Sequence, residues 1–195
     1  MATLLVAGLT GSGKTSATKL AAERLAYDWV SGSDLRRKFF GLGGLAADGL
    51  RLGHALSEPN LHLESERLRS NSGEQDFDAE LLRIATSTDN AVFDVWFLPW
   101  LARDQPVLTV LLRASLQVRA RRVAHMMGFD VIQAVGIISE KDERARQYAR
   151  KQYGIDIDQD NARFSLVLDT DELTTVEVAS RLSELIQGGT SAELE

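Results

Sequence analysis

Short runs of apolar residues alternate along the chain with longer segments in which apolar residues recur at helical spacing. The short runs are rich in Val, Leu or aromatic residues and are predicted to be buried strands: residues 3–8, 27–31, 91–96, 107–113 and 164–170. The helical spacing predicts helices over residues 13–26, 115–127, 138–152 and 174–187. Strands that alternate with helices are typical of a parallel sheet covered on both faces, so the pattern predicts a three-layer α/β fold with a five-stranded parallel sheet.

Two stretches do not fit this alternation. Residues 41–75 are rich in glycine and polar residues, which predicts a mobile or loosely helical segment. Residues 128–137 carry a glycine near each end, Gly128 and Gly136, and we expect these glycines to be the hinges of a small lid.

Length and composition favour a single domain that binds no nucleic acid. The chain has 195 residues, of which 44% are hydrophobic, which suffices for one well-buried domain but not for two large ones. We expect that domain to span residues 1–189, followed by a disordered polar tail at 190–195. With 22 Lys and Arg against 28 Asp and Glu, the net charge is −6, so the basic excess typical of nucleic-acid binding is missing. An anionic ligand must therefore be held by local positive charge.

The sequence also excludes several kinds of metal and membrane site. It contains no cysteine, so disulfides and thiolate metal sites are excluded. Its histidines are scattered without the spacing of a metal site: His54, His62 and His125. Because neither a targeting segment nor a run long enough to span a bilayer is recognised, we expect a cytoplasmic protein, monomeric or homodimeric, that does not bind membranes.

The segment between the first predicted strand and the first predicted helix, GLTGSGKT at residues 8–15, fits the phosphate-binding motif G-x-x-x-x-G-K-[ST]. Its glycines allow successive N–H groups to point inward at phosphate oxygens, and the helix start adds partial positive charge. Lys14 is expected to bridge the β- and γ-phosphates of ATP, and the Thr15 hydroxyl to hold Mg²⁺. The predicted nucleotide-binding residues are Gly8, Thr10, Gly11, Ser12, Gly13, Lys14, Thr15 and Ser16. A glycine-rich turn with an incidental lysine is disfavoured because motif and context agree.

Beyond this loop, the chain resembles the cytidylate kinases, in particular the short archaeal type, within the nucleoside monophosphate kinase family. The resemblance covers most of the chain and includes GLTGSGKT as the family's loop. VSGSDLRR resembles the family's acceptor motif and places Ser31, Asp34 and Arg37 on its positions. FDAELLRIA is similar to an acceptor helix at Asp78, and AVFDVWFLPW aligns with a strand ending Glu-Gly-Arg that is followed by a tryptophan, here Trp100.

Two further segments carry the resemblance. LQVRARRVA is similar to the helix that leads into the family's lid, with Arg119 and Arg122 on matching positions. YGIDID…LVLDT, from Tyr153 to Thr170, is the most characteristic match. The resemblance implies a P-loop NTPase fold and a kinase that uses ATP and Mg²⁺, with an acceptor-binding region at about residues 38–88 and a lid at about 128–150.

Phosphoryl transfer needs charge neutralisation and in-line positioning more than covalent help, so charged residues are the main candidates. By resemblance, Arg37 clamps the acceptor phosphate, although the basic run from Arg36 to Lys38 is also compatible with a solvated surface. Asp94 ends a predicted buried strand, where a carboxylate can hold Mg²⁺ through water or simply cap a turn. Asp34 could share the ligand shell of the metal or begin a helix.

The predicted lid helix, KDERARQYARKQYG, is basic. Candidates to neutralise charge on the triphosphate are Arg119, Arg122, Lys141, Arg144, Arg146 and Arg150. Arg119 and Arg122 are favoured because they share a helix face at the lid entrance. For the others, the alternative is a solvated helix with carboxylate partners, such as Glu140 and Arg144 four residues apart. The predicted catalytic residues are Lys14, Arg37, Asp94, Arg119, Arg122, Arg146 and Arg150.

The chain departs from the family pattern on the acceptor side. Where the family has Glu-Gly-Arg, this chain has Asp94-Val95-Trp96, and the helix at Asp78 lacks both arginines of the family. Loss of a charge-assisted contact to phosphate weakens binding by roughly 1.5 to 3 kcal/mol, so two losses could change the preferred acceptor. Trp96 and Trp100 could stack on a substrate ring or lie in the core. The predicted acceptor-binding residues are Ser31, Asp34, Arg37, Asp78 and Trp96.

Three functions are compatible with these residues. The leading one is ATP- and Mg²⁺-dependent phosphorylation of a nucleoside monophosphate, CMP or dCMP by resemblance. The second is phosphorylation of a hydroxyl group on a nucleoside, sugar or antibiotic, because an alcohol gains from a carboxylate base whereas an acceptor phosphate needs arginines. The third, a nucleotide-binding regulator without transfer activity, is disfavoured by the presence of Lys14, Thr15, Asp94 and the lid arginines.

Overall fold

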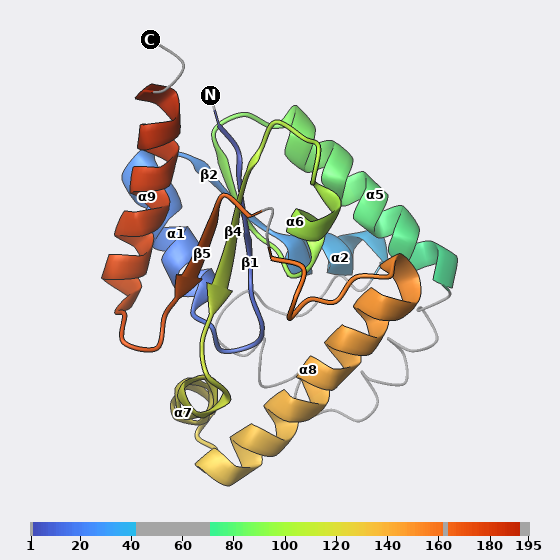
Figure 1. The fold of residues 1–195 in the computed structure, drawn as a ribbon, viewed down its shortest axis with the longest axis vertical. Coiled ribbons are helices and arrows are strands. Elements are labelled where there is room, and N and C mark those ends of the chain that lie inside the picture. Colours follow the sequence, from blue (N-terminus) through green and yellow to red (C-terminus); the bar gives the residue numbers. More distant parts are fainter. Residues whose placement is uncertain (1, 42–70, 162–163, 192–195) are drawn as a thin grey trace.

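The computed structural model of the protein describes residues 2–41, 71–161 and 164–191. Its strands are β1 (Leu4–Ala7), β2 (Asp28–Ser31), β3 (Ala91–Asp94), β4 (Leu108–Arg113) and β5 (Leu166–Asp169). Its helices are α1 (Lys14–Leu25), α2 (Gly32–Phe39), α5 (Asn71–Ser87), α6 (Leu98–Leu101), α7 (Leu116–Met127), α8 (Val131–Tyr153) and α9 (Thr175–Ser191). The sheet lies between two groups of helices (Figure 1).

The five strands run parallel in the order β2-β3-β1-β4-β5, which confirms the predicted α/β fold. β1 is the central strand, and its Leu5 lies opposite Phe93 of β3 and Thr109 of β4. The chain passes from β1 to β2 on one side of the sheet and later to β4 on the other side. The carboxyl end of β1 is therefore the point where the strand order reverses, which is where open α/β sheets bind ligands.

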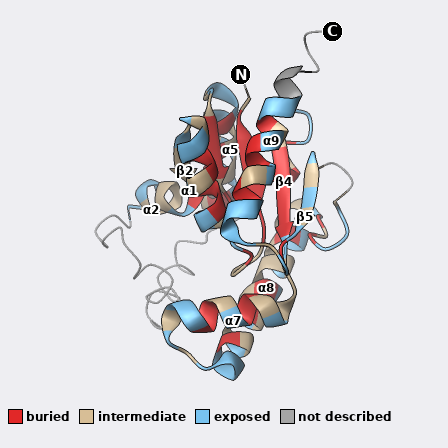
Figure 2. Ribbon diagram, turned by 90° about the vertical axis from the view of Figure 1, so that its left-hand side faces the viewer, coloured by how far each residue is buried: buried red, intermediate tan, exposed pale blue. Residues whose placement is uncertain are grey.

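Successive residues of β1 face opposite layers of helices. Leu4 and Val6 lie in a core with α1 and α9, to which α1 contributes the small residues Ala17 and Ala21. Leu5 lies in a second core, formed with α5 and α6 on the other face. The central strands β1, β3 and β4 are mostly buried, whereas the edge strands β2 and β5 are partly exposed, as Figure 2 shows for β4 and β5. The apolar run of β1 is thus explained by burial on both faces.

α7 and α8 lie at the carboxyl end of the sheet (Figure 1). They pack on each other through Ala120 and Val123 of α7 and Ala134 and Ile138 of α8. Ala149, near the other end of α8, lies instead in a core with residues of β1, β4 and α6. α8 therefore runs across the edge of the sheet at which ligands are expected.

The predicted lid helix begins earlier than expected, at Val131, and runs through Gly136. Asp130 caps this helix: its Oδ1 accepts a hydrogen bond from the Gln133 N–H (2.8 Å), and the Gln133 side chain accepts one from the Asp130 N–H (3.4 Å). This capping box and the packing against α7 offset the cost of about 1 kcal/mol for a glycine within a helix. The expected break at Gly136 is therefore wrong, whereas Gly128 ends α7.

The other predicted elements agree with the structure to within a few residues, whereas α2, α5 and α6 were not among the helices predicted from the apolar spacing. α5 includes the end of the glycine-rich stretch at 41–75, while residues 42–70 of that stretch lie outside the described residues. α9 continues to Ser191, past the predicted start of the disordered tail. In the described part of the chain, no helix has the length and apolar character needed to cross a membrane.

The core between the sheet and α9 yields a stability prediction. Leu182 is 0% exposed there, so Leu182→Ala removes apolar contacts and leaves a cavity. We expect the free energy of unfolding, measured by urea denaturation, to fall by about 2–5 kcal/mol. Val176→Ala, on the exposed side of the same helix, is the matched control and should change it by less than about 0.5 kcal/mol. Equal losses for the two variants would contradict the packing described for α9.

Candidate active site

The loop of residues 8–15 joins the carboxyl end of β1 to α1. Gly11 and Gly13 have left-handed backbone conformations (φ 83° and 91°), which glycine adopts without strain. A Cβ atom at Gly11 would also lie 2.8 Å from the carbonyl oxygen of Arg119, so a side chain there would clash. Gly13 immediately precedes α1, whose first N–H groups have no partner within the helix. These N–H groups make the helix start suitable for an anion.

Several carbonyl oxygens of the loop are held by α7 and by the segment after β5. Arg119 donates from Nη1 to the carbonyl of Thr10 (3.1 Å). Thr170 donates from Oγ1 to the carbonyl of Ser12 (3.2 Å), and Arg122 donates in turn to Oγ1 of Thr170 (3.1 Å). Because carbonyls are bound on this side, the N–H groups of the loop are left to face an anion on the other side.

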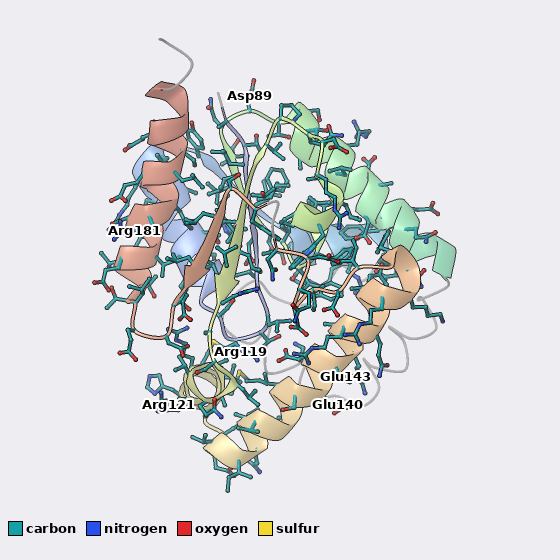
Figure 3. All side chains as sticks on the ribbon, viewed as in Figure 1. Asp89, Arg119, Arg121, Glu140, Glu143 and Arg181 are labelled. Carbon is teal, nitrogen blue, oxygen red and sulfur yellow. The ribbon has the colours of Figure 1, made fainter. Side chains whose placement is uncertain are left out.

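Arg119 forms a buried ion pair with Asp142 of α8. Their side chains are 6% and 4% exposed, and Arg119 donates from Nη2 to Oδ2 (2.6 Å) and from Nη1 to Oδ1 (3.2 Å) of Asp142. Figure 3 shows Arg119 where α7 approaches the loop and α8. A buried charge is tolerated when it is paired and hydrogen-bonded, and this bidentate contact meets both needs. The catalytic roles predicted for Arg119 and Arg122 stay predictions, since here both side chains bind protein groups.

Lys14, the first residue of α1, turns back toward the loop. Its Nζ donates to the carbonyl of Gly8 and to that of Leu9 (3.4 Å). Burial lowers the pKa of Lys14, while the carboxylate of Asp94 opposes this shift. Burial also lowers the pKa of Lys141 on α8, and the charge of Lys14 adds to that effect. Two lysines from different helices are thus close enough to repel each other, and an anion between them would favour both charged forms.

The structure brings together the residues predicted to hold Mg²⁺, Thr15 and Asp94. Thr15 donates from Oγ1 to Oδ2 of Asp94 (2.5 Å). Asp94 ends β3, where it lies opposite Val6 of β1. Hydroxyl and carboxylate oxygens are ligands that Mg²⁺ prefers, and Mg²⁺ commonly completes its shell with water and phosphate oxygens. The two side chains therefore fit Mg²⁺. Ser16 is exposed on the first turn of α1, one residue further on.

The predicted acceptor motif lies where β2 passes into α2. Ser31 caps α2: its Oγ accepts a hydrogen bond from the Asp34 N–H (3.2 Å). Asp34 lies in the first turn, where a carboxylate is favoured by the helix dipole, and it accepts a hydrogen bond from Arg37. Of the alternatives for these residues, the structure therefore has Asp34 beginning a helix and Arg37 in a partly buried ion pair.

Asp78 of α5 accepts hydrogen bonds from two tyrosines of α8. The hydroxyls of Tyr153 (2.6 Å) and Tyr148 (3.0 Å) both donate to its Oδ2. Burial raises the pKa of Asp78, and the two tyrosine hydrogen bonds oppose that shift. On the same helix, Glu80 pairs with Arg83 (2.7 Å).

The two tryptophans after β3 have different environments. Trp100 is 5% exposed and donates from Nε1 to the carbonyl of Asp160 (3.0 Å), so it belongs to the core. Trp96 is 40% exposed, and its ring centre lies 5.5 Å from that of Tyr148 and 5.7 Å from that of Phe97. Trp96 therefore presents an open aromatic surface at the carboxyl end of β3.

A cavity of about 270 Å³ lies beside the loop, and its lining includes Gly8, Ser12, Trp96, Arg113, Arg146 and Asp158. Arg146 of α8 donates from Nε to Oδ2 of Asp158 (2.7 Å), and Arg113 ends β4. Ser12 Oγ is buried and has no hydrogen-bond partner among the described residues. The cavity thus combines basic side chains, an open aromatic ring and an unsatisfied hydroxyl next to the glycine loop, as a site for a polar, anionic ligand would.

Some predicted site residues do not reach this cavity. Arg150 pairs instead with Asp156 (2.9 Å). Arg144 donates from Nη2 to Oε1 of Glu140, four residues earlier (2.5 Å), which confirms that predicted pair. Three arginines of α8, Arg144, Arg146 and Arg150, are therefore each paired with a carboxylate of the protein, as the solvated-helix alternative has it.

The sequence interpretation missed four residues of the site: Arg113, Asp142, Tyr148 and Asp158. Arg113 had a signal, because it ends a buried strand at the edge where ligands bind. Asp142 and Tyr148 had none, since their partners are 23 and 70 residues away in the sequence.

Comparison with known proteins gives one family. The model of the cytidylate kinase-like family matches residues 6–172. A cytidylate kinase of Aeropyrum pernix is 31% identical over 179 residues, 91% of this chain and 94% of the relative. A cytidylate kinase of Sulfurisphaera tokodaii is 27% identical over 176 residues, 90% of each chain.

A solved structure agrees with the fold. Shikimate kinase from Bacteroides thetaiotaomicron superposes with a TM-score of 0.56 at 17% identity, covering 95% of this chain and 98% of that one. At this identity the likeness concerns the three-layer architecture alone.

The buried ion pair below the loop yields a second stability prediction. Asp142→Ala leaves the Arg119 guanidinium buried without its counter-charge, so we expect the free energy of unfolding to fall by about 3–5 kcal/mol. The matched control is Glu140→Ala, which removes the exposed partner of Arg144 from the same helix and should cost less than about 0.5 kcal/mol. Urea denaturation of both variants provides the measurement. If Asp142→Ala unfolds like its control, the pair is not buried as described.

Proposed function

The chain belongs to the cytidylate kinase-like family, and on this premise we propose that it transfers the γ-phosphoryl group of ATP, with Mg²⁺, to a nucleoside monophosphate, CMP or dCMP. The observation that carries the proposal is the meeting of Lys14, Thr15 and Asp94 at the glycine loop. Phosphoryl transfer depends on such a concentration of N–H groups, lysine and metal-binding oxygens around the transferred group.

On the donor side, the loop binds phosphate oxygens through its N–H groups while its carbonyls stay bound to α7 and Thr170. Lys14 exchanges the Gly8 carbonyl for phosphate oxygens, which restores the charged form that burial disfavours. Lys141 adds positive charge from α8. Thr15 and Asp94 hold Mg²⁺, which supplies positive charge to the phosphate oxygens when bound.

On the acceptor side, arginines of the cavity bind the acceptor phosphate in place of the family arginines that the chain lacks. Arg146 and Arg113 line the cavity beside the loop, while Arg37 of α2 lies outside that lining and pairs with Asp34. Arg146 and Arg37 are each held by a carboxylate, so an acceptor phosphate with more negative charge replaces that partner without leaving the guanidinium unpaired.

At the nucleoside end, we assign Trp96 to stacking on the base and Asp78 to a hydrogen bond with it. Trp96 is 40% exposed and next to the cavity. Asp78 is the family position that the resemblance carries over, and its carboxylate lies beside Tyr148, which contacts the Trp96 ring. An aromatic plane with a neighbouring carboxylate suits a base that carries an amino group.

A second candidate is transfer to a hydroxyl group of a nucleoside or sugar. The observation that favours it is the same Trp96, since the family has an arginine there and this chain has an open ring that suits a neutral acceptor. In that reaction a carboxylate base would accept the proton of the attacking hydroxyl.

Lys14→Ala tests the donor site. It removes a charge from the place where negative charge gathers in the transition state, so we expect kcat for ATP-dependent transfer to fall by about 10²-fold or more in a folded protein. Lys19→Ala, an exposed lysine of the same helix that lies over Trp29, is the control and should leave kcat unchanged. A folded Lys14→Ala enzyme with normal turnover would falsify the proposed donor site.

Trp96→Arg decides between the two acceptors. With CMP, the new guanidinium gains a charge-assisted contact to the acceptor phosphate while the base loses the Trp96 ring; because the contact to phosphate is the stronger of the two, we expect kcat/KM to rise by up to about tenfold, which corresponds to roughly 1.4 kcal/mol. With a neutral acceptor such as cytidine, the change removes a stacking surface and should lower kcat/KM.

The measurement is a coupled ADP-release assay with nucleoside monophosphates, nucleosides and simple sugars, and with ATP alone. Trp96→Phe is the matched control, because it keeps an aromatic ring and adds no charge. Turnover of the wild type with hydroxyl acceptors but with no nucleoside monophosphate would replace the first candidate by the second. If none of the tested acceptors supports ADP release above that with ATP alone, neither candidate function stands.

A further inference from the structure

Two tyrosines of α8 converge on one carboxylate oxygen of α5. Tyr148 and Tyr153 are five positions apart, yet both hydroxyls donate to Oδ2 of Asp78, at 3.0 and 2.6 Å. Residues five apart do not share a face of a helix. Both hydroxyls reach the same oxygen because the carboxyl end of α8 lies close to α5.

The rings of these tyrosines are fixed by the segment that follows β3. Phe97 stacks on Tyr153 with ring centres 5.1 Å apart, and Trp96 lies 5.5 Å from Tyr148. Each phenol therefore has its ring held by packing and its hydroxyl held by Asp78. Such support from two directions leaves the carboxylate little freedom to rotate.

The second oxygen of the carboxylate is not used in this way. Oδ1 of Asp78 accepts no hydrogen bond from any side chain that the structure describes, whereas Oδ2 accepts two. An ionised carboxylate can accept at both oxygens, so Oδ1 keeps its capacity to accept from a ligand.

We infer that Tyr148 and Tyr153 are positioning residues for the acceptor: they hold the Asp78 carboxylate so that Oδ1 accepts a hydrogen bond from an amino group of the substrate. The inference rests on the proposed function, because it gives that site its means of preferring an amino-bearing base. A base with a carbonyl oxygen in place of the amino group would face the carboxylate without a donor and be disfavoured.

The charges around Asp78 determine how this arrangement responds to pH. Burial raises the pKa of Asp78, the hydroxyls of Tyr153 and Tyr148 lower it, Glu74 on α5 raises it, and Arg36 of α2 lowers it. Removal of a hydroxyl therefore raises the pKa further. Since only the ionised carboxylate accepts at both oxygens, use of the acceptor should fail at a higher pH in a Tyr→Phe variant than in the wild type.

The test compares Tyr153→Phe and Tyr148→Phe with the control Tyr27→Phe. Tyr27 is the remaining tyrosine of the chain, and it packs against the core beside α1. Each of the first two variants loses one hydrogen bond to a charged group, so we expect KM for CMP to rise about five- to tenfold with KM for ATP unchanged. The preference for CMP over UMP should fall by a similar factor. Tyr27→Phe should change neither.

Two pH readouts separate positioning from a purely structural role. The acid limb of kcat/KM for CMP should move to higher pH in Tyr153→Phe, and the Asp78 carboxyl signal in ¹³C NMR should titrate at higher pH in the same variant without substrate. Loss of stability alone would lower activity at every pH and leave both midpoints in place.

The inference is overturned if the wild type phosphorylates CMP and Tyr153→Phe and Tyr148→Phe keep the wild-type KM, CMP preference and acid limb. In that case the proposed function stands. If the wild type phosphorylates no nucleoside monophosphate, the proposed function fails, and the acceptor role of Asp78 fails with it even where the NMR midpoint moves.

Discussion

The carbonyl oxygens of the glycine loop must be bound on one side for its N–H groups to be free on the other, and much of the structure serves that constraint. A charged guanidinium, Arg119, reaches the Thr10 carbonyl from below, and such a group can be buried only beside a counter-charge. Asp142 supplies it from α8. The placement of α7 and α8 at the carboxyl end of the sheet thus follows from the electrostatic needs of a loop that begins near residue 8.

Features determined by nearby residues could be predicted from the sequence. The apolar run of β1, the glycine loop and the start of α1 each depend on neighbours in the chain, and the structure places them as expected. The start of α8 was also encoded locally, by the capping box of Asp130 and Gln133, although the helix was predicted to begin only at residue 138. A cap and packing against α7 stabilise a helix more than one glycine weakens it.

Features determined by distant residues could not be predicted. Trp96 and Trp100 are near neighbours in one segment with the same side chain, yet one is open and the other buried, because only Trp100 packs against Phe164 and reaches the Asp160 carbonyl. On the acceptor side, the sequence shows which arginines of the family pattern are absent, but it does not show which other arginines the fold brings near. The cavity arginine Arg113, from a different strand, was overlooked there.

α8 has 23 residues, and its middle and its carboxyl end are tied to different parts of the molecule. Its middle carries Asp142, which pairs with Arg119 beneath the phosphate loop, and its last residue, Tyr153, is hydrogen-bonded to Asp78 of α5. If the loop shifts when one substrate enters, α8 would carry part of that displacement to the site of the other substrate. Linkage then requires the effect to be mutual: whatever free energy the first substrate adds to binding of the second, the second adds to binding of the first.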